Sequence, residues 1–170
     1  RTVTGVQTCA LPIFFNYLTG RGSVVGEALV ADPRLAGLTF TGSYEVGMGL
    51  LRRMTSGAWP RPCIAEMGGK NPAIITARGD LDLAAQGVMR SAFGLQGQKC
   101  SACSRVYVER EISAEFLRRV VEKTSALRIG NPLDRRVFLG PVINAGAVET
   151  YQRAVAQALR DGGRVRSEEH

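Results

Sequence analysis

The sequence predicts an α/β fold built around parallel strands. Short apolar runs, typical of strands, alternate along the chain with amphipathic stretches of roughly ten residues or more, typical of helices. An apolar fraction of 45% in 170 residues allows a substantial core. No apolar run approaches the length of a membrane-spanning helix, so we expect no membrane partner.

The first half of the chain predicts a strand–helix–strand unit preceded by a helix. The apolar run at 38–40 is strand-like, and the Thr-Gly-Ser sequence after it is typical of a turn that leads into a helix. The expected elements are a helix at 23–31, a strand at 38–40, a helix at 44–55 and a strand at 63–66.

The second half repeats this alternation. A glycine-containing loop is expected at 67–72, and the next helix has Asp80 and Asp82 near its start, where negative charge is favoured. The expected elements are a strand at 73–76, a helix at 81–95, a strand at 105–109, and helices at 113–127 and 145–159.

Both ends of the chain resemble a translated sequencing adapter. The C-terminal RSEEH can be written as AGA TCG GAA GAG CAC, and the reverse complement of this DNA lies within a permitted coding of VTGVQTCALPI at 3–13. We therefore interpret residues 1–13 and 166–170 as adapter-derived, and exclude them from reasoning about the fold. Cys9 and His170, the only histidine, then carry no chemistry, so a Cys-His or Ser-His dyad is not expected.

Charge and cysteine content limit the function further. The net charge of +7 raises the question of nucleic-acid binding, but the basic residues are scattered over helical segments, and no nucleic-acid motif accompanies them. We expect no nucleic-acid partner. Without Cys9, the cysteines are Cys63, Cys100 and Cys103, an odd number that argues against a disulfide framework and for a reducing, cytoplasmic setting.

Two glycine-containing motifs are candidates for a nucleotide site. In FTGSYEVG, a strand enters a Gly-Ser turn and a helix, whose free N–H groups can hold a phosphate. In EMGGKNP, Glu66 ends a strand and two glycines follow, which lets the backbone approach a ligand closely. An ordinary turn and a loop or capping carboxylate are the alternatives that the residues leave open.

The segment FGLQGQKCSACSR contains a C-x-x-C pair, Cys100 and Cys103. A redox pair of the thioredoxin type would lie after the first strand of a small domain, and a zinc site would need a second pair, whereas only Cys63 remains. We therefore expect no metal. Cys100 follows a polar Gly-Gln-Lys turn, where N–H groups and nearby positive charge can support a thiolate, while Cys63 is interpreted as an inert, buried thiol.

Taken together, FTGSYEVG, EMGGKNP, FGLQGQKCSACSR, IGNPLD and FLGPVIN resemble the aldehyde dehydrogenase superfamily over almost all of 14–163. The string around Cys100 is most similar to the branch that oxidises glutamate γ-semialdehyde, the pyrroline-5-carboxylate dehydrogenases. The resemblance implies a fragment of that fold: 14–66 as the C-terminal part of a Rossmann-like NAD(P)-binding domain, and 67–165 as the N-terminal part of an α/β catalytic domain.

The resemblance also implies catalytic roles. Cys100 is the nucleophile that attacks the aldehyde, forming a thiohemiacetal and then a thioester. Glu66 is the general base for Cys100 or for the water that hydrolyses the thioester. The oxyanion would be held by the Cys100 N–H and by a side-chain amide that this chain lacks. Cys103 is interpreted as a packing residue, with a regulatory Cys100–Cys103 disulfide as a minor hypothesis.

Binding roles are implied in the same way. Gly42 and Ser43 would lie at the cofactor pyrophosphate, the Met67 backbone near the nicotinamide amide, and Ser101 near the α-carboxylate of the substrate. The implied cofactor is NAD, with NADP possible, and the implied partners are a small aldehyde and further copies of the full-length protein in a homo-oligomer. A lysine, an asparagine and a glutamate of the family site fall outside the chain, so we expect the 170 residues alone to be inactive and prone to aggregate.

Three alternatives remain open. The same class of enzyme could act on another aldehyde. A thiol–disulfide oxidoreductase would use both Cys100 and Cys103, so that serine at either position would be equally damaging. A non-catalytic nucleic-acid-binding module would show strongly salt-dependent binding.

Overall fold

The computed structural model describes residues 14–166 of the chain. The two ends interpreted as adapter-derived therefore lie outside the described residues, apart from Arg166. Contacts between residues divide the chain into two compact units, and the division falls between Met67 and Gly68. Each unit is built on one pair of parallel strands, which confirms the predicted α/β class.

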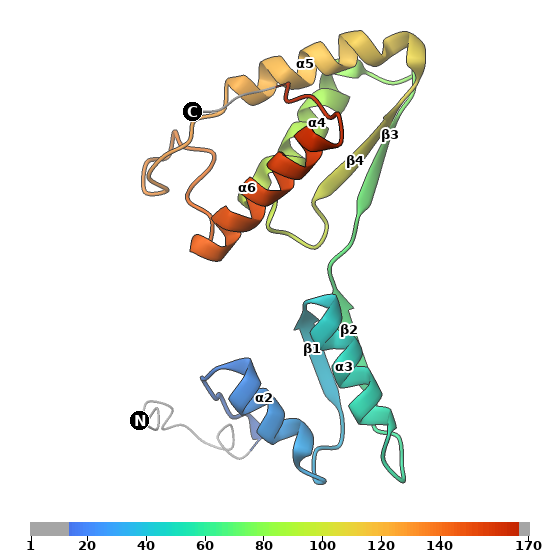
Figure 1. The fold of residues 1–170 in the computed structure, drawn as a ribbon, viewed down its shortest axis with the longest axis vertical. Coiled ribbons are helices and arrows are strands. Elements are labelled where there is room, and N and C mark those ends of the chain that lie inside the picture. Colours follow the sequence, from blue (N-terminus) through green and yellow to red (C-terminus); the bar gives the residue numbers. More distant parts are fainter. Residues whose placement is uncertain (1–13, 167–170) are drawn as a thin grey trace. The chain divides into compact units, whose positions relative to one another are not determined.

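The first unit is a strand–helix–strand motif with one additional helix before it (Figure 1). The two strands pair in parallel from Leu38 opposite Cys63 to Gly42 opposite Met67. All four elements predicted from the sequence are present, and the helix predicted at 44–55 has those bounds. The elements are α2 (Gly22–Ala31), β1 (Leu38–Gly42), α3 (Tyr44–Thr55) and β2 (Cys63–Met67).

A close contact between α3 and β2 holds the first unit together. A Cβ atom added at the buried Gly47 would lie 2.6 Å from Sδ of Met67, so a side chain at position 47 would require the Met67 thioether to move. Met54, on the last turn of the same helix, is completely buried. The guanidinium of Arg61 donates to the carbonyls of Val30, Asp32 and Leu35, and so satisfies the C-terminal end of α2.

The second unit also contains a succession of strand, helix and strand, followed by two further helices. Its strands pair in parallel from Asn71 opposite Cys103 to Ile75 opposite Val108. A non-helical turn at Gly94–Gly97 and a short 3₁₀ segment at Arg110–Ile112 connect these elements. The elements are β3 (Asn71–Ile75), α4 (Leu81–Phe93), β4 (Cys103–Val108), α5 (Ser113–Ser125) and α6 (Ala145–Arg160).

The core of the second unit lies where α4 and α5 cover the β3–β4 pair. Ile75, Ala85, Val88 and Phe116 form a buried cluster, against which side chains of both strands and both helices pack. Asp80 caps α4 by accepting from the N–H groups of its first turn, as its position in the sequence predicts. By contrast, no residue of α6 is buried.

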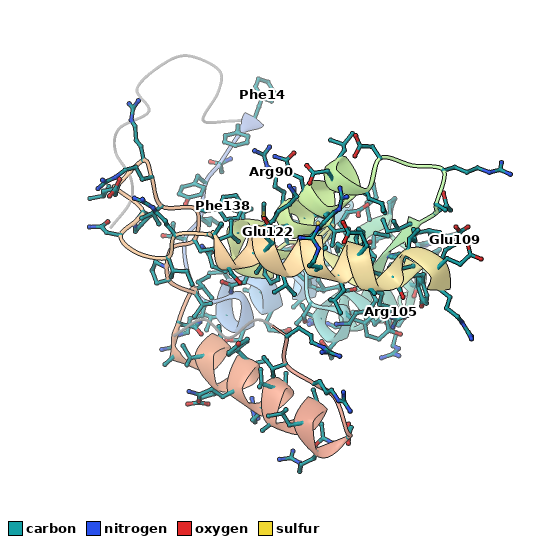
Figure 2. The ribbon with its side chains drawn as sticks, turned by 90° about the horizontal axis from the view of Figure 1, so that it is seen from above. Phe14, Arg90, Arg105, Glu109, Glu122 and Phe138 are labelled. Atoms are coloured by element: carbon teal, nitrogen blue, oxygen red, sulfur yellow. The ribbon has the colours of Figure 1, made fainter. Side chains whose placement is uncertain are left out.

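Ion pairs cover the outer surface of α5, the helix that carries the Glu122 label in Figure 2. Glu115 accepts hydrogen bonds from Arg118 (2.8 and 2.9 Å) and from Arg119 (2.7 Å), and these bonds lower the pKa of its carboxyl group from 4.5 to about 2. Lys123 contacts Asp82 of α4 at 2.9 Å. The arginines of α5 are thus engaged with acidic neighbours, as expected of a solvated helix face.

Four predicted boundaries in the second unit were wrong by two residues, and those of β3, α4 and β4 lie next to the candidate site. β3 begins at Asn71 rather than at residue 73 and includes Pro72, which a register shift between Asn71 and Pro72 accommodates. α4 ends at Phe93 rather than at residue 95, because Gly94 adopts extended backbone angles. β4 begins at Cys103 rather than at residue 105, and α5 ends at Ser125 rather than at residue 127.

Truncating the core should destabilise the second unit. In Phe116→Ala we expect the free energy of unfolding to fall by about 3–5 kcal/mol, because a buried aromatic ring leaves a cavity. Urea unfolding of the 170-residue chain, followed by circular dichroism, measures this. The neighbouring Leu117→Ala, at a site 40% exposed, is the control and should cost less than about 1 kcal/mol. Equal losses in the two variants would contradict the described core.

The ion pairs of Glu115 predict a pH-dependent stability. A carboxyl group whose pKa is lower in the folded chain stabilises it above the unfolded value of 4.5, and this contribution disappears as the pH falls towards about 2. In Glu115→Gln the urea midpoint should therefore be below that of the unmodified chain at pH 7, and the two midpoints should converge near pH 2. Glu149→Gln is the control, since Glu149 has no ion pair among residues 14–166. A difference that persists at low pH would contradict the assignment.

Candidate functional site

The first unit gathers four of the predicted site residues at one edge of its sheet. Because β1 and β2 are parallel, both strands end on the same side, and ligands of α/β proteins bind at such carboxyl ends. Gly42 lies opposite Met67 in the register, and Ser43 follows Gly42 directly. Glu66 lies one position earlier, opposite Thr41. The proposed base and the proposed cofactor contacts of this unit are therefore neighbours.

The start of α3 has the features of a phosphate site. Ser43 is the N-cap residue, and its hydroxyl accepts a hydrogen bond from the N–H of Val46 at 3.3 Å. Within the described residues, the N–H groups of Tyr44 and Glu45 have no acceptor. These free donors at the N-terminus of a twelve-residue helix suit an anion such as the pyrophosphate of a dinucleotide. That Gly42 and Ser43 bind a cofactor stays a prediction.

Glu66 is exposed near the C-terminal end of β2. The strand alternates between half-buried and exposed residues, and Glu66 shares its exposed face with Ile64. The opposite face, with Cys63 and Met67, is half-buried, so Cys63 is less buried than its interpretation as a core thiol implies. A carboxylate on the open face of a strand end is available to a substrate or a water molecule.

In the second unit, an unusual backbone turn precedes Cys100. Leu95, Gln96 and Gly97 all have positive φ angles, of 53°, 56° and 68°. This left-handed conformation is sterically unfavourable for a non-glycine residue, and such strain often accompanies functional loops. The turn ends α4 and directs the chain into the segment Gln98–Cys103, which leads to β4.

Cys100 lies exposed in this segment, as the polar sequence around it predicts. The Lys99 carbonyl accepts a hydrogen bond from the N–H of Ala102 at 3.1 Å, closing a turn with Cys100 and Ser101 at its centre. Among the described residues, no acceptor is hydrogen-bonded to the N–H group of either Cys100 or Ser101. The thiol is thus next to free donors, an arrangement suited to binding an oxyanion.

Asn71 holds the Cys100 turn on the start of β3. Its Nδ2 donates to the carbonyl of Cys100 at 2.7 Å and to that of Ala102 at 3.1 Å. Gly69 lies beside this contact: a Cβ atom there would be in ordinary contact with the Cys100 oxygen at 3.6 Å and slightly close to Oδ1 of Asn71 at 3.3 Å.

Cys103 is the first residue of β4 and is half-buried. Its thiol donates to the Arg105 carbonyl at 3.4 Å, and its N–H donates to Oγ of Ser91 on α4 at 3.2 Å. These contacts describe a residue engaged in local structure. A packing role remains the prediction for Cys103, beside the minor hypothesis of a disulfide.

A shallow cavity of about 150 Å³ adjoins the turn. Its lining includes Ser101, Lys99 and Arg90, the last labelled in Figure 2 on the surface of α4, together with Ser91, Gly94 and Leu95. Two cationic side chains and a hydroxyl favour an anionic group. Ser101, predicted to contact a substrate carboxylate, therefore faces a suitable environment within its own unit.

Other kinds of site are not found in the part of the chain that the structure describes. Residues 14–166 contain no group of three His, Cys, Asp or Glu side chains placed to hold a metal ion. None of the described helices is both long and apolar enough to cross a membrane.

The sequence-based prediction missed the roles of Asn71, Ser91 and Gln98. Gln98 accepts from the N–H of Ile143 at 3.3 Å, 45 positions away. Asn71 lies within the motif EMGGKNP, yet its partners are 29 and 31 positions further along the chain. No local pattern in the sequence indicates such contacts. The side-chain amide of Asn71 within the motif EMGGKNP was the available signal.

Comparison with known proteins identifies the family. The model of the aldehyde dehydrogenase family matches residues 7–170. Curated relatives include 1-pyrroline-5-carboxylate dehydrogenases of Geobacillus thermodenitrificans, 40% identical over 151 residues, and of Anoxybacillus flavithermus, 41% identical; 86% of this chain and 29% of each relative are covered. The chain thus spans less than a third of their length.

Solved structures agree. A 1-pyrroline-5-carboxylate dehydrogenase from Thermus with bound NAD has a TM-score of 0.77 at 37% identity, covering 83% of this chain and 28% of that one. Lactaldehyde dehydrogenase from Escherichia coli has a TM-score of 0.81 at 36% identity, covering 87% and 31%. The two parallel strand pairs and the exposed cysteine turn are therefore parts of a known fold, and the chain belongs to the aldehyde dehydrogenase family.

Proposed function

We propose that this chain provides the catalytic cysteine and the general base of an NAD(P)+-dependent aldehyde dehydrogenase whose favoured substrate is L-glutamate γ-semialdehyde. The observation that carries the proposal is the exposed Cys100 in a turn with free N–H groups. In this proposal the first unit is the end of the nucleotide-binding domain, and the second unit begins the catalytic domain.

The chemistry requires only groups that this chain supplies, apart from the cofactor and a second oxyanion donor. The Cys100 thiolate attacks the aldehyde carbon, and a C–S bond forms while the carbonyl oxygen becomes an oxyanion. The free N–H of Cys100 stabilises that oxyanion. After loss of a hydride, the thioester is hydrolysed by a water molecule that gives a proton to Glu66.

The cofactor would bind at the carboxyl edge of the β1–β2 pair. The free N–H groups at the start of α3 suit its pyrophosphate, and Gly42 and Ser43 line that turn. Met67, opposite Gly42, would present its backbone to the nicotinamide. When bound, an oxidised nicotinamide supplies the acceptor for the hydride. NAD is supported by the Thermus relative, whose structure contains it.

The substrate is proposed from Ser101 and the curated relatives. Ser101, Lys99 and Arg90 line one cavity, whose positive charge favours a substrate that carries a carboxylate. Curated relatives at about 40% identity are named 1-pyrroline-5-carboxylate dehydrogenases. Another aldehyde is the alternative. A homo-oligomer of the longer protein and a cytoplasmic location belong to the same proposal.

A hybrid enzyme tests the proposed roles. Residues 14–165 replace the matching segment of the Thermus 1-pyrroline-5-carboxylate dehydrogenase, and NADH formation is measured with glutamate γ-semialdehyde and NAD+. Cys100→Ser should abolish turnover, and Glu66→Gln should lower kcat by about 10²-fold to 10⁴-fold, because it removes a general base. A short aliphatic aldehyde without a carboxylate distinguishes the favoured substrate from the alternative.

Cys103→Ser is the matched control in the hybrid. As a packing residue it should leave kcat close to that of the unmodified hybrid, whereas a thiol–disulfide oxidoreductase needs both cysteines. Equal loss in Cys100→Ser and Cys103→Ser would contradict the dehydrogenase mechanism. Circular dichroism of each variant establishes that its fold is retained.

The 170-residue chain by itself should not turn over. We expect no NADH formation above background from the purified chain, because the family residues implied to complete the oxyanion hole and the ribose contacts are not in its sequence. A full-length relative assayed under the same conditions is the positive control. Turnover near the rate of that relative would contradict this expectation.

A further inference from the structure

Only some of the peptide groups of the Cys100 turn are hydrogen-bonded to the rest of the chain. Hydrogen bonds engage the carbonyls of Lys99, Cys100 and Ala102. They also engage the N–H groups of Ala102 and Cys103. The N–H groups of Lys99, Cys100 and Ser101 remain without an acceptor among the described residues, and the last two flank the Cys100 thiol. Most carbonyls of the turn are therefore hydrogen-bonded within the chain, while the N–H groups beside the thiol are available to a ligand.

The direction of these donors follows from peptide geometry. In a trans peptide group, the C=O and the N–H point in opposite directions. The carbonyl of Lys99 faces the N–H of Ala102, so the N–H of Cys100 faces away from the closed turn. The carbonyl of Cys100 faces Asn71, so the N–H of Ser101 faces away from Asn71.

Asn71 is the one side chain of the described residues that fixes the Cys100–Ser101 peptide group. A side-chain amide has two N–H donors, and Asn71 uses its amide nitrogen for both carbonyls, at 2.7 and 3.1 Å. It is itself fixed, because it is half-buried and paired in register with Cys103 at the start of β3. Without it, a solvent-exposed turn could rotate this peptide group and turn the Ser101 N–H inward.

We propose that Asn71 is a positioning residue, which orients the free N–H groups of Cys100 and Ser101 as donors to the oxyanion formed when Cys100 is acylated. The inference rests on the proposed function, in which Cys100 is the nucleophile. It adds Ser101 N–H as a donor, and it assigns the amide in EMGGKNP a role separate from that of Glu66.

Two reactions of the same thiol separate this role from simple structural support. With 4-nitrophenyl acetate, the thiolate attacks the ester carbonyl, an oxyanion forms, and a C–S bond replaces the C–O bond as 4-nitrophenolate leaves. With iodoacetamide, the thiolate displaces iodide and no oxyanion forms. The ratio of the two rate constants therefore reports oxyanion stabilisation, independently of how accessible or ionised the thiol is.

The test uses the 170-residue chain with Cys9, Cys63 and Cys103 replaced by serine, so that Cys100 is the only thiol. We expect its acylation-to-alkylation ratio to exceed that of N-acetylcysteine by about tenfold, less than for a fully enclosed oxyanion hole. Asn71→Ala should bring the ratio to within about twofold of N-acetylcysteine. Asn71→Asp, similar in shape but without the two donors, should do the same.

Asn144→Ala removes another side-chain hydrogen bond in the second unit, the cap of α6, and should leave the ratio unchanged. If Asn71→Ala loses its helical circular dichroism, Asn71→Ser, which keeps one hydroxyl donor, takes its place with an intermediate ratio expected. A ratio that stays high in Asn71→Asp, or one equal to N-acetylcysteine in the unmodified turn, would overturn the inference.

The outcome does not depend on dehydrogenase activity. A hybrid enzyme that oxidises the semialdehyde, together with a ratio that Asn71 does not affect, would leave the proposed function intact and remove the role of Asn71. An inactive hybrid with a ratio that falls in both Asn71 variants would do the reverse. The two proposals therefore fail separately.

Discussion

Parallel pairing of strands is the constraint on which the arrangement of this chain depends. Because β1 and β2 run in the same direction, the turn after β1 and the turn after β2 lie at one edge of the sheet. This pairing makes Gly42 and Met67 direct neighbours although 25 positions of sequence, including all of α3, separate them. The same rule in the second unit places Asn71 opposite Cys103, within reach of the turn that carries Cys100. In each unit, one parallel pair brings together residues that the chain presents far apart.

Most helices and strands could be predicted because their signals are local. The apolar run at 38–40, the Asp80 cap and the amphipathic pattern of α5 each depend on a few adjacent residues. The errors arose where a distant contact decides the structure. Pro72 is found in a strand because the register with β4 shifts beside it. α4 ends where Gly94 adopts extended angles, and the left-handed angles of Leu95 and Gln96 that follow are required by no residue type.

The candidate site divides in the same way. Cys100, Glu66, Gly42 and Ser43 stand within motifs whose order along the chain resembles one family, so a sequence suffices to nominate them. Asn71 stands in one of those motifs too, yet its partners are the carbonyls of Cys100 and Ala102, and a carbonyl is a group that every residue has. Main-chain acceptors leave no trace in the sequence. Only the geometry shows which of them a side chain contacts.

The contact between Gly47 and Met67 has a consequence for how this segment can change over evolution. Gly47 has no proposed contact with the substrate. It packs against the side chain of Met67 at the end of β2, and Glu66 is the residue before Met67. Any side chain at position 47 would have to displace the thioether of Met67, which is the far end of a flexible side chain. Tolerance to mutation along α3 should consequently be set by what lies beneath the helix rather than by distance from the reacting thiol. Position 47 of α3 would thus be one where selection acts on side-chain volume rather than on chemistry.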